Sequence, residues 1–213
     1  MIKEYIQTIN QALDGRSNLP PIHKFALLSI DEKLLLRYLS KNLSSNSIIV
    51  EVGCYVGAST AIMADANPQV QVHSFDPFDE KSHDPNHRQI LDECLGQGKE
   101  RTYENVRDRL NRSNITLHKG YSPQDFQMWD QPIDMYFEDG LHRDPIFSDN
   151  IKFWSSKLKV GGILAIHDNR PWLSTTDRLY HIDVIMKVEK LKLDSNWDFL
   201  GQLNSLTVFK KIV

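Results

Sequence analysis

Three polar side chains occur where apolar, strand-like segments give way to turns. Asp139 follows the apolar run 133–137, and Asp168 and Asn169 follow the apolar run 163–166. Carboxylate and amide oxygens suit hard divalent cations such as Mg²⁺ or Ca²⁺, which keep part of their water. If the two runs are adjacent strands, their ends could share one metal ion. The alternative is that these residues only cap strands and form turns, as Asp and Asn often do.

A glycine-bearing turn follows the first predicted strand. It reads Glu-Val-Gly-Cys-Tyr-Val-Gly over 51–57. Gly53 can adopt a positive φ and let the backbone approach a ligand, and Gly57 permits close packing of a helix on a strand. The spacing is not the G-x-G-x-x-G of dinucleotide-binding folds, so it favours a nucleoside without a pyrophosphate over NAD. A tight turn without a ligand is the alternative.

An acidic residue, Asp76, closes the second predicted strand, 25 residues after Glu51. Folds of this kind place there an acid that accepts hydrogen bonds from ribose hydroxyls. Asp76 precedes a proline, so it could instead be an ordinary turn residue. The glycine turn and the strand-end acid together favour a nucleoside site.

The elements that must position these residues alternate between strand-like and helix-like segments, which predicts an α/β sheet. Strands are expected over 47–52, 70–75, 115–118, 133–137 and 163–166, with 197–200 and 205–210 as an antiparallel hairpin at the sheet edge. Helical segments are expected over 1–13, 31–40, 58–66, 100–112, 145–158 and 182–191. The polar segment 77–97 shows no period and is predicted to be irregular; it and the segment from Arg170 onward are candidate lids.

The composition narrows the class of protein. The 213 residues carry 25 Lys and Arg against 28 Asp and Glu, which predicts one domain and gives no support for a nucleic-acid surface. Cys54 and Cys94 form neither a disulfide framework nor a C-x-x-C metal pair. No stretch approaches the roughly 20 apolar residues of a membrane span, and the N-terminus lacks the pattern of a secretory signal. We therefore expect a soluble, cytoplasmic protein.

The ordered motifs resemble those of the class I S-adenosylmethionine-dependent methyltransferases. The likeness rests on 51–57, Asp76, Glu-Asp-Gly-Leu-His over 138–142, Lys-Val-Gly-Gly over 159–162 and His-Asp-Asn over 167–169. It is greatest with small-molecule O-methyltransferases of the catechol type and with the group that carries a D-G-x-H motif after the fourth strand. The resemblance implies a Rossmann-like, seven-stranded, mostly parallel sheet with an antiparallel C-terminal hairpin strand and helices on both faces. It covers 47–213 and leaves 1–46 as an N-terminal helical cover, which could complete the acceptor site or form a dimer contact.

The same resemblance implies S-adenosylmethionine as the cofactor. The glycine turn would line its methionine part, Asp76 would hold its ribose, and Ser122 would contact its adenine. The implied cofactor-binding residues are Glu51, Gly53, Tyr55, Gly57, Ser59, Asp76, Ser122 and Asp139.

The resemblance also implies a metal ion and a base. Catechol-type enzymes hold Mg²⁺ with residues that match Asp139, Asp168 and Asn169, so that the metal lowers the pKa of a substrate hydroxyl. They carry a lysine base three residues after the first aspartate, where this chain has His142. Because an imidazole with an ordinary pKa near about 6.5 accepts protons at neutral pH, His142 is our candidate base. The alternative is a surface histidine ahead of the helix 145–158.

The expected function is thus metal-assisted methyl transfer to an oxygen of a small-molecule acceptor, with a homodimer possible and no nucleic-acid or membrane partner. Two alternatives stay open: different chemistry on the same fold, such as oxygenation or another acceptor, and a non-catalytic cofactor-binding or assembly module. A NAD dehydrogenase is less favoured because its glycine spacing differs.

Overall fold

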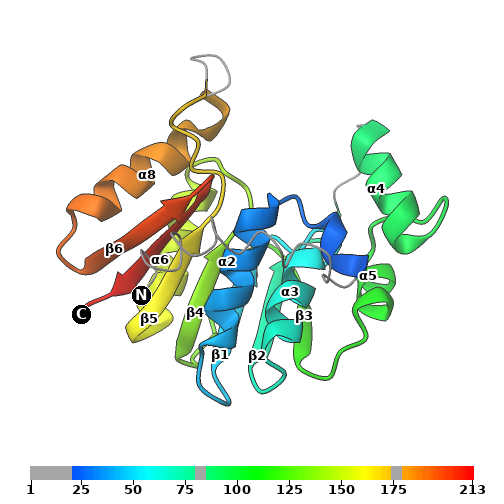
Figure 1. Cartoon of the computed structure of the whole chain (residues 1–213), viewed down its shortest axis with the longest axis horizontal. Coiled ribbons are helices and arrows are strands. Elements are labelled where there is room, and N and C mark those ends of the chain that lie inside the picture. Colours follow the sequence, from blue (N-terminus) through cyan, green and yellow to red (C-terminus); the bar gives the residue numbers. More distant parts are fainter. Residues whose placement is uncertain (1–20, 80–84, 174–178) are drawn as a thin grey trace.

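The fold is built on one seven-stranded sheet with the order β3-β2-β1-β4-β5-β7-β6 (Figure 1). The computed structural model describes residues 21–79, 85–173 and 179–213. Its strands are β1 (Ile48–Val52), β2 (Gln71–Asp76), β3 (Ile115–Lys119), β4 (Ile133–Glu138), β5 (Leu158–Ile166), β6 (Trp197–Leu203) and β7 (Leu206–Lys211). Strands β1 to β5 pair with one another in parallel, and β7 runs antiparallel to both β5 and β6. The predicted mostly parallel sheet with an antiparallel C-terminal hairpin is confirmed.

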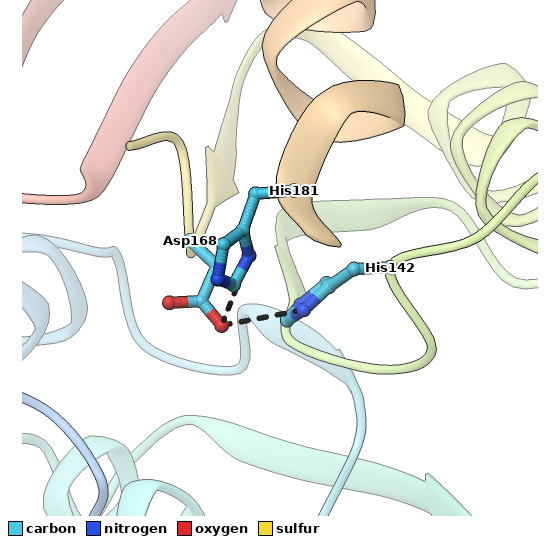
Figure 2. Close-up of side chains that lie close together, drawn as sticks. All are labelled: His142, Asp168 and His181. Atoms are coloured by element: carbon cyan, nitrogen blue, oxygen red, sulfur yellow. Dashed lines mark ion pairs between the residues drawn. The ribbon is translucent and has the colours of Figure 1, made fainter. Parts of the chain in front are cut away.

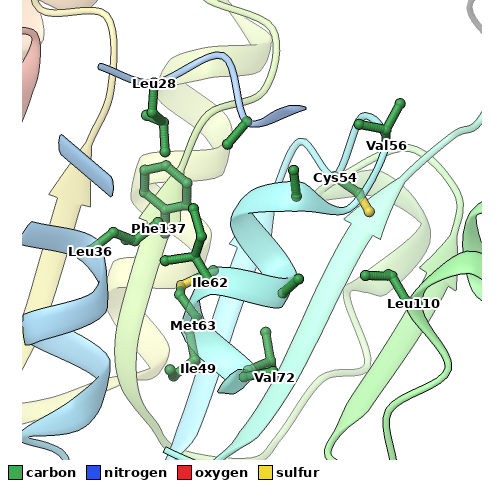
Figure 3. Packing of buried hydrophobic residues seen from close by; sticks show 14 of the residues in the cluster. Leu28, Leu36, Ile49, Cys54, Val56, Ile62, Met63, Val72, Leu110 and Phe137 are labelled. Carbon is green, nitrogen blue, oxygen red and sulfur yellow. The ribbon is translucent and has the colours of Figure 1, made fainter. Parts of the chain in front are cut away.

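Helices cover both faces of the sheet, as predicted. On one face lie η2 (Pro21–Phe25), α2 (Ile30–Lys41), α3 (Ala58–Ala66), α4 (Pro85–Leu95) and α5 (Tyr103–Leu110), whose buried side chains form one core cluster with the strands (Figure 3). On the other face, α6 (Ile146–Lys157) and α8 (Ile182–Leu193) form a second cluster, with Trp154 fully buried in it. Two short 3-10 helices, η3 (Gln124–Phe126) and η4 (Leu179–His181), complete the described elements.

The central strand β1 is apolar on both faces because helices cover both. Ile49 packs into the cluster of α3, whereas Val50 and Val52 pack into the cluster of α6. Such near-continuous apolar runs are typical of parallel strands buried on both sides. Glu51 interrupts the run with a carboxyl group that has no access to solvent.

Helix α2 ties the N-terminal segment to the far end of the chain. Ser29 and Glu32 form a reciprocal capping box at its start. Glu32 also accepts hydrogen bonds from the backbone and the side chain of Ser205, each at 2.7 Å, just before β7. The described part of 1–46 therefore packs on the main core, while the division at residue 46 stays a prediction.

The structure corrects the prediction for 77–97 in part: α4 occupies Pro85–Leu95. The polar composition concealed an amphipathic helix, because Leu91, Cys94 and Leu95 give it one buried face.

The hairpin turn also falls later than predicted, at Asn204 and Ser205, since β6 continues to Leu203. The helix predicted over 1–13 lies outside the described residues. Among the residues described, no helix has the length and apolar character to cross a membrane.

Candidate active site

A cavity of about 580 Å³ opens at the carboxyl ends of the parallel strands. This is the edge at which open α/β sheets bind their ligands. Eight of the residues singled out from sequence line it: Gly53, Tyr55, Ser59, Asp76, Ser122, Asp139, His142 and Asp168. The segment 25–28, just before α2, lines it as well. Glu51, Gly57 and Asn169 are not among its lining residues.

Gly53 is required by the close approach of two strand ends. Its φ is +93°, and a Cβ there would lie 2.2 Å from the backbone oxygen of Asp139. The backbone N–H of Asp139 donates to the oxygen of Val52 at 2.9 Å, which fixes that approach. The close approach of Asp139 thus explains a glycine at this position without any ligand. Gly53 also lines the cavity.

Gly57 starts helix α3 in the left-handed conformation, with φ +78°. A Cβ there would lie 2.6 Å from the side chain of Leu110. Gly57 therefore allows α3 to pack closely against helix α5, whereas the sequence analysis expected close packing on a strand, and it is not among the residues that line the cavity.

Glu51 lies beneath the cavity and acts on it through hydroxyl groups. The side chains of Ser59, Thr60 and Ser74 each donate to its carboxyl group at 2.5 Å. Burial raises the pKa of Glu51 to about 7, against the effect of these hydrogen bonds. Of the three partners only Ser59 lines the cavity, so Glu51 positions Ser59 rather than facing a ligand directly.

Asp76 is held by the glycine turn and by a buried arginine. One carboxylate oxygen accepts from the backbone N–H groups of Cys54 and Tyr55 at 3.1 and 3.0 Å. The other accepts from the N–H of Phe78 and pairs with Arg101, both at 2.7 Å. The two side chains of the ion pair are only 7% and 4% exposed. Asp76 thus fastens the turn after β1 to the end of β2.

Ser122 joins the cavity wall to helix α6. Its hydroxyl donates to the side-chain oxygen of Asn150 and accepts from the indole N–H of Trp154, both at 2.8 Å. These two bonds fix the hydroxyl, because both partners are buried.

Asp139 stands at the end of a buried polar chain that reaches α2. Nδ1 of His167 lies 2.9 Å from Asp139, and Nε2 of His167 lies 3.1 Å from the hydroxyl of Ser205, which donates to Glu32. Burial would lower the pKa of His167, but the charge and hydrogen bond of Asp139 and the carboxylate of Glu32, 3.7 Å from Nε2, outweigh it and raise the pKa to about 10. For Glu32, burial is outweighed in the same way by His167 and Ser205, which lower its pKa to about 2. A cationic imidazole therefore lies between two carboxylates.

Three basic side chains lie close to the carboxylate of Asp168, which lines the cavity. Nδ1 of His142 lies 3.2 Å from its Oδ2, Nδ1 of His181 lies 4.0 Å from the same oxygen, and the guanidinium of Arg170 lies 2.5 Å from its Oδ1. In Figure 2, both rings point toward the Asp168 carboxylate, one from the loop after β4 and one from η4. Burial lowers the pKa of His142, despite the opposing charges of Asp139 and Asp168, which keeps the imidazole neutral at neutral pH.

The oxygen-only set expected for magnesium fits this geometry poorly. Asp139 is paired with the cationic imidazole of His167, so its carboxylate already has a buried partner. The amide nitrogen of Asn169 donates to the side chains of Gln202 and Thr207, and its Oδ1 is buried without a hydrogen-bond partner among the described residues. The residue nevertheless lies outside the cavity lining, so this oxygen does not face the cavity that Asp139 and Asp168 share. We therefore derive no step through Mg²⁺ at these residues.

The sequence model of a family described as a methyltransferase domain matches residues 50–169, more than half of the chain. The chain belongs to this methyltransferase family. The match runs from β1 to the residues after β5, and so includes the glycine turn, Asp76 and the strand ends around Asp139 and Asp168.

Solved structures share the class I S-adenosylmethionine-dependent methyltransferase fold with this methyltransferase. The Podospora anserina methyltransferase PaMTH1 with bound S-adenosylhomocysteine is similar over 99% of this chain and 96% of its own, with a TM-score of 0.65 and 13% identity. The O-methyltransferase TomG from Streptomyces achromogenes, in complex with S-adenosylmethionine, is similar over 100% of this chain and 89% of its own, with a TM-score of 0.58 and 14% identity. An rRNA methylase from Streptococcus thermophilus is similar over 84% of this chain and 95% of its own, with a TM-score of 0.54 and 21% identity. These identities establish the fold alone. A comparison with curated proteins found no match.

Several residues around the methyltransferase cavity were not predicted. Thr60 and Ser74 could have been anticipated, because a buried acid in an apolar strand needs hydroxyl donors on its neighbours. Arg101, Glu32 and His181 carry no such signal, since only the folded chain brings them to Asp76, His167 and Asp168.

Proposed function

We propose that this methyltransferase transfers a methyl group from S-adenosylmethionine to an oxygen of a small-molecule acceptor, with His142 as the general base. The observation that carries the proposal is a single cavity, lined by the glycine turn and Asp76 and also by His142. A cofactor and an acceptor can thus meet inside one enclosure, as in-line transfer requires.

The cofactor would lie along the turn after β1. Gly53 and Ser59 line the cavity and would bind its methionine part. Asp76 would accept from the ribose hydroxyls in place of one of its four present donors, because a carboxylate offers about four acceptor positions and all of them are filled. Ser122 lines the same cavity and would contact the adenine. When bound, S-adenosylmethionine supplies an electrophilic methyl group, whose transfer leaves S-adenosylhomocysteine.

His142 would take the proton of the acceptor hydroxyl. Its Nδ1 faces Asp168, which orients the ring, and its Nε2 is buried without a hydrogen-bond partner among the described residues. A neutral imidazole in that position accepts a proton as the oxygen–methyl bond forms and the methyl–sulfur bond breaks. Asp168 then stabilises the charged ring that results.

The acceptor is proposed to be small for two reasons. About 580 Å³ must hold the cofactor together with the acceptor, and the net charge of −3 gives nucleic acid no attraction. Residues 25–28 line the cavity, which favours the N-terminal segment as part of the acceptor site over a role in a homodimer.

The test combines cofactor binding with turnover. S-adenosylmethionine binding is measured by calorimetry, and S-adenosylhomocysteine release is measured with catechols, flavonoids and sugars as acceptors. We expect His142→Ala to lower turnover by about 10²-fold or more and to leave cofactor affinity within a few-fold. A near-normal rate in this variant would reject His142 as the base.

The same measurements address the alternatives. Cofactor binding without release of S-adenosylhomocysteine for any acceptor would favour different chemistry on this fold. Absence of cofactor binding would favour a non-catalytic module and overturn the proposal.

A further inference from the structure

His181 lies beside the cavity, and the proposed reaction does not use it. It ends η4 on the side of the sheet covered by α8, and only 8% of its surface is exposed. Its Nδ1 is buried without a hydrogen-bond partner among the described residues. Since buried polar atoms are normally paired, this atom calls for an explanation.

The three side chains of Figure 2 present their ligand atoms to a common point. One atom each from His142, Asp168 and His181 lies within 4.8 Å of the other two. The two nitrogens that face Oδ2 of Asp168 lie 3.2 and 4.0 Å from it. Ligand atoms bound at about 2.0–2.2 Å from one ion are roughly 3–3.6 Å apart, so shifts of up to about 1 Å would complete the site.

We propose that His142, Asp168 and His181 form a binding site for a divalent first-row transition metal such as Zn²⁺ or Co²⁺. Two imidazole nitrogens and one carboxylate oxygen suit these ions, whereas Mg²⁺ prefers oxygen ligands throughout. The site differs from the set expected from the sequence in using two histidines in place of Asp139 and Asn169.

The surroundings of Asp168 leave one oxygen for the ion. Its Oδ1 is paired with Arg170 at 2.5 Å, so Oδ2 faces the two histidines. The ring of His142 packs edge-on against Phe147, with centroids 6.4 Å apart, which restrains it. Residues that orient ligands in this way are usual around metal sites.

A second possible group, formed by Asp139, His167 and Asp168, is less suited to a metal. Both ring nitrogens of His167 already have partners, Asp139 at 2.9 Å and Ser205 at 3.1 Å. A metal there would have to break that buried chain, whereas His181 has an unpartnered nitrogen to offer.

Metal binding and the base role compete for His142. A neutral imidazole that binds a metal through Nδ1 carries its proton on Nε2, which then cannot accept another. The metal site stands on the geometry of three side chains and not on the proposed reaction, so it is tested without turnover.

The experiment uses full-length protein without a histidine tag, after treatment with a chelator. Co²⁺ is added in steps while its visible absorption bands report ligand geometry, and Zn²⁺ and Mg²⁺ binding are measured by calorimetry. We expect about one equivalent of Co²⁺ or Zn²⁺ and much weaker binding of Mg²⁺. His181→Ala should weaken Zn²⁺ binding at least about tenfold, because it removes one of three ligands.

The matched variant is Asn169→Ala, which should keep transition-metal binding because Asn169 is not a ligand in this proposal. Melting curves and circular dichroism confirm that each variant is folded, and His181→Gln replaces His181→Ala if the latter is not. Absence of Zn²⁺ and Co²⁺ binding to the wild type overturns the proposal, as does unchanged affinity in a folded His181 variant. Preferential Mg²⁺ binding that is lost in Asn169→Ala would also overturn it. Cofactor binding, measured separately, shows whether the proposed function fails independently.

Discussion

The substitution Glu51→Gln provides a quantitative test of the buried carboxyl group beneath the cavity. Glu51 is fully enclosed and accepts from three hydroxyl groups, and burial raises its pKa to about 7 from an ordinary value of 4.5. The folded protein therefore keeps this proton over a pH range in which the unfolded chain has released it. Where the folded state binds more protons, the free energy of unfolding decreases as the pH rises.

The magnitude follows from the two pKa values. At about 1.4 kcal/mol for each unit of pKa, the difference between 4.5 and about 7 corresponds to roughly 3 kcal/mol. This destabilisation develops between about pH 4.5 and pH 7 and is complete near pH 8. The amide side chain of the variant has no charge at any of these pH values. The stability of the variant relative to wild type should therefore rise by about 3 kcal/mol between pH 4 and pH 8.

Urea denaturation at several pH values measures this difference. Any cost of rearranging the hydrogen bonds of Ser59, Thr60 and Ser74 applies at every pH in the variant, so it shifts the whole curve and leaves its pH dependence unchanged. Glu104→Gln, at an exposed position, controls for loss of a carboxylate as such. A difference in the free energy of unfolding between Glu51→Gln and wild type that stays constant within about 0.5 kcal/mol from pH 4 to pH 8 would contradict a raised pKa of Glu51.

Three further predictions concern stability. Gly53→Ala should lower the free energy of unfolding by more than about 3 kcal/mol, because it combines backbone strain with a 2.2 Å clash. Gly98→Ala, with φ +75° and open space around its Cβ position, should lower it by only about 1–2 kcal/mol. Urea denaturation compares the two variants. Arg101→Leu should cost about 3–5 kcal/mol, because it leaves the carboxylate of Asp76 buried without its cation, and an unchanged melting temperature would contradict this. Glu32→Gln should lower the free energy of unfolding by at most about 3 kcal/mol at pH 7. The loss should shrink as the pH falls from about 4.5 toward 2, because the lowered pKa of Glu32 stabilises the fold only while its carboxylate is charged. A loss that does not depend on pH would argue against the ion pair with His167.

The sheet could be predicted because its strands are marked by strong local signals. Apolar runs buried on both faces identified the central strands, and small residues after the glycine turn identified α3 with its bounds at Ala58 and Ala66. Helix α4 was missed because its buried face is only a few residues wide in an otherwise polar segment. Local composition predicts an element well only when most of its surface is buried.

The edge of the sheet that carries the chemistry follows from the order of strands and acids in the sequence. Parallel strands end at one edge, so acids that follow successive strands meet there whatever the details of packing. Asp76, Asp139 and Asp168 accordingly line one cavity. The contacts of each acid, in contrast, depend on how the whole chain folds. Arg101 reaches Asp76, Ser205 reaches Glu32 across 173 positions of sequence, and His181 comes to Asp168 from a separate helix, because the packing of helices on the sheet, and no local pattern, sets those distances.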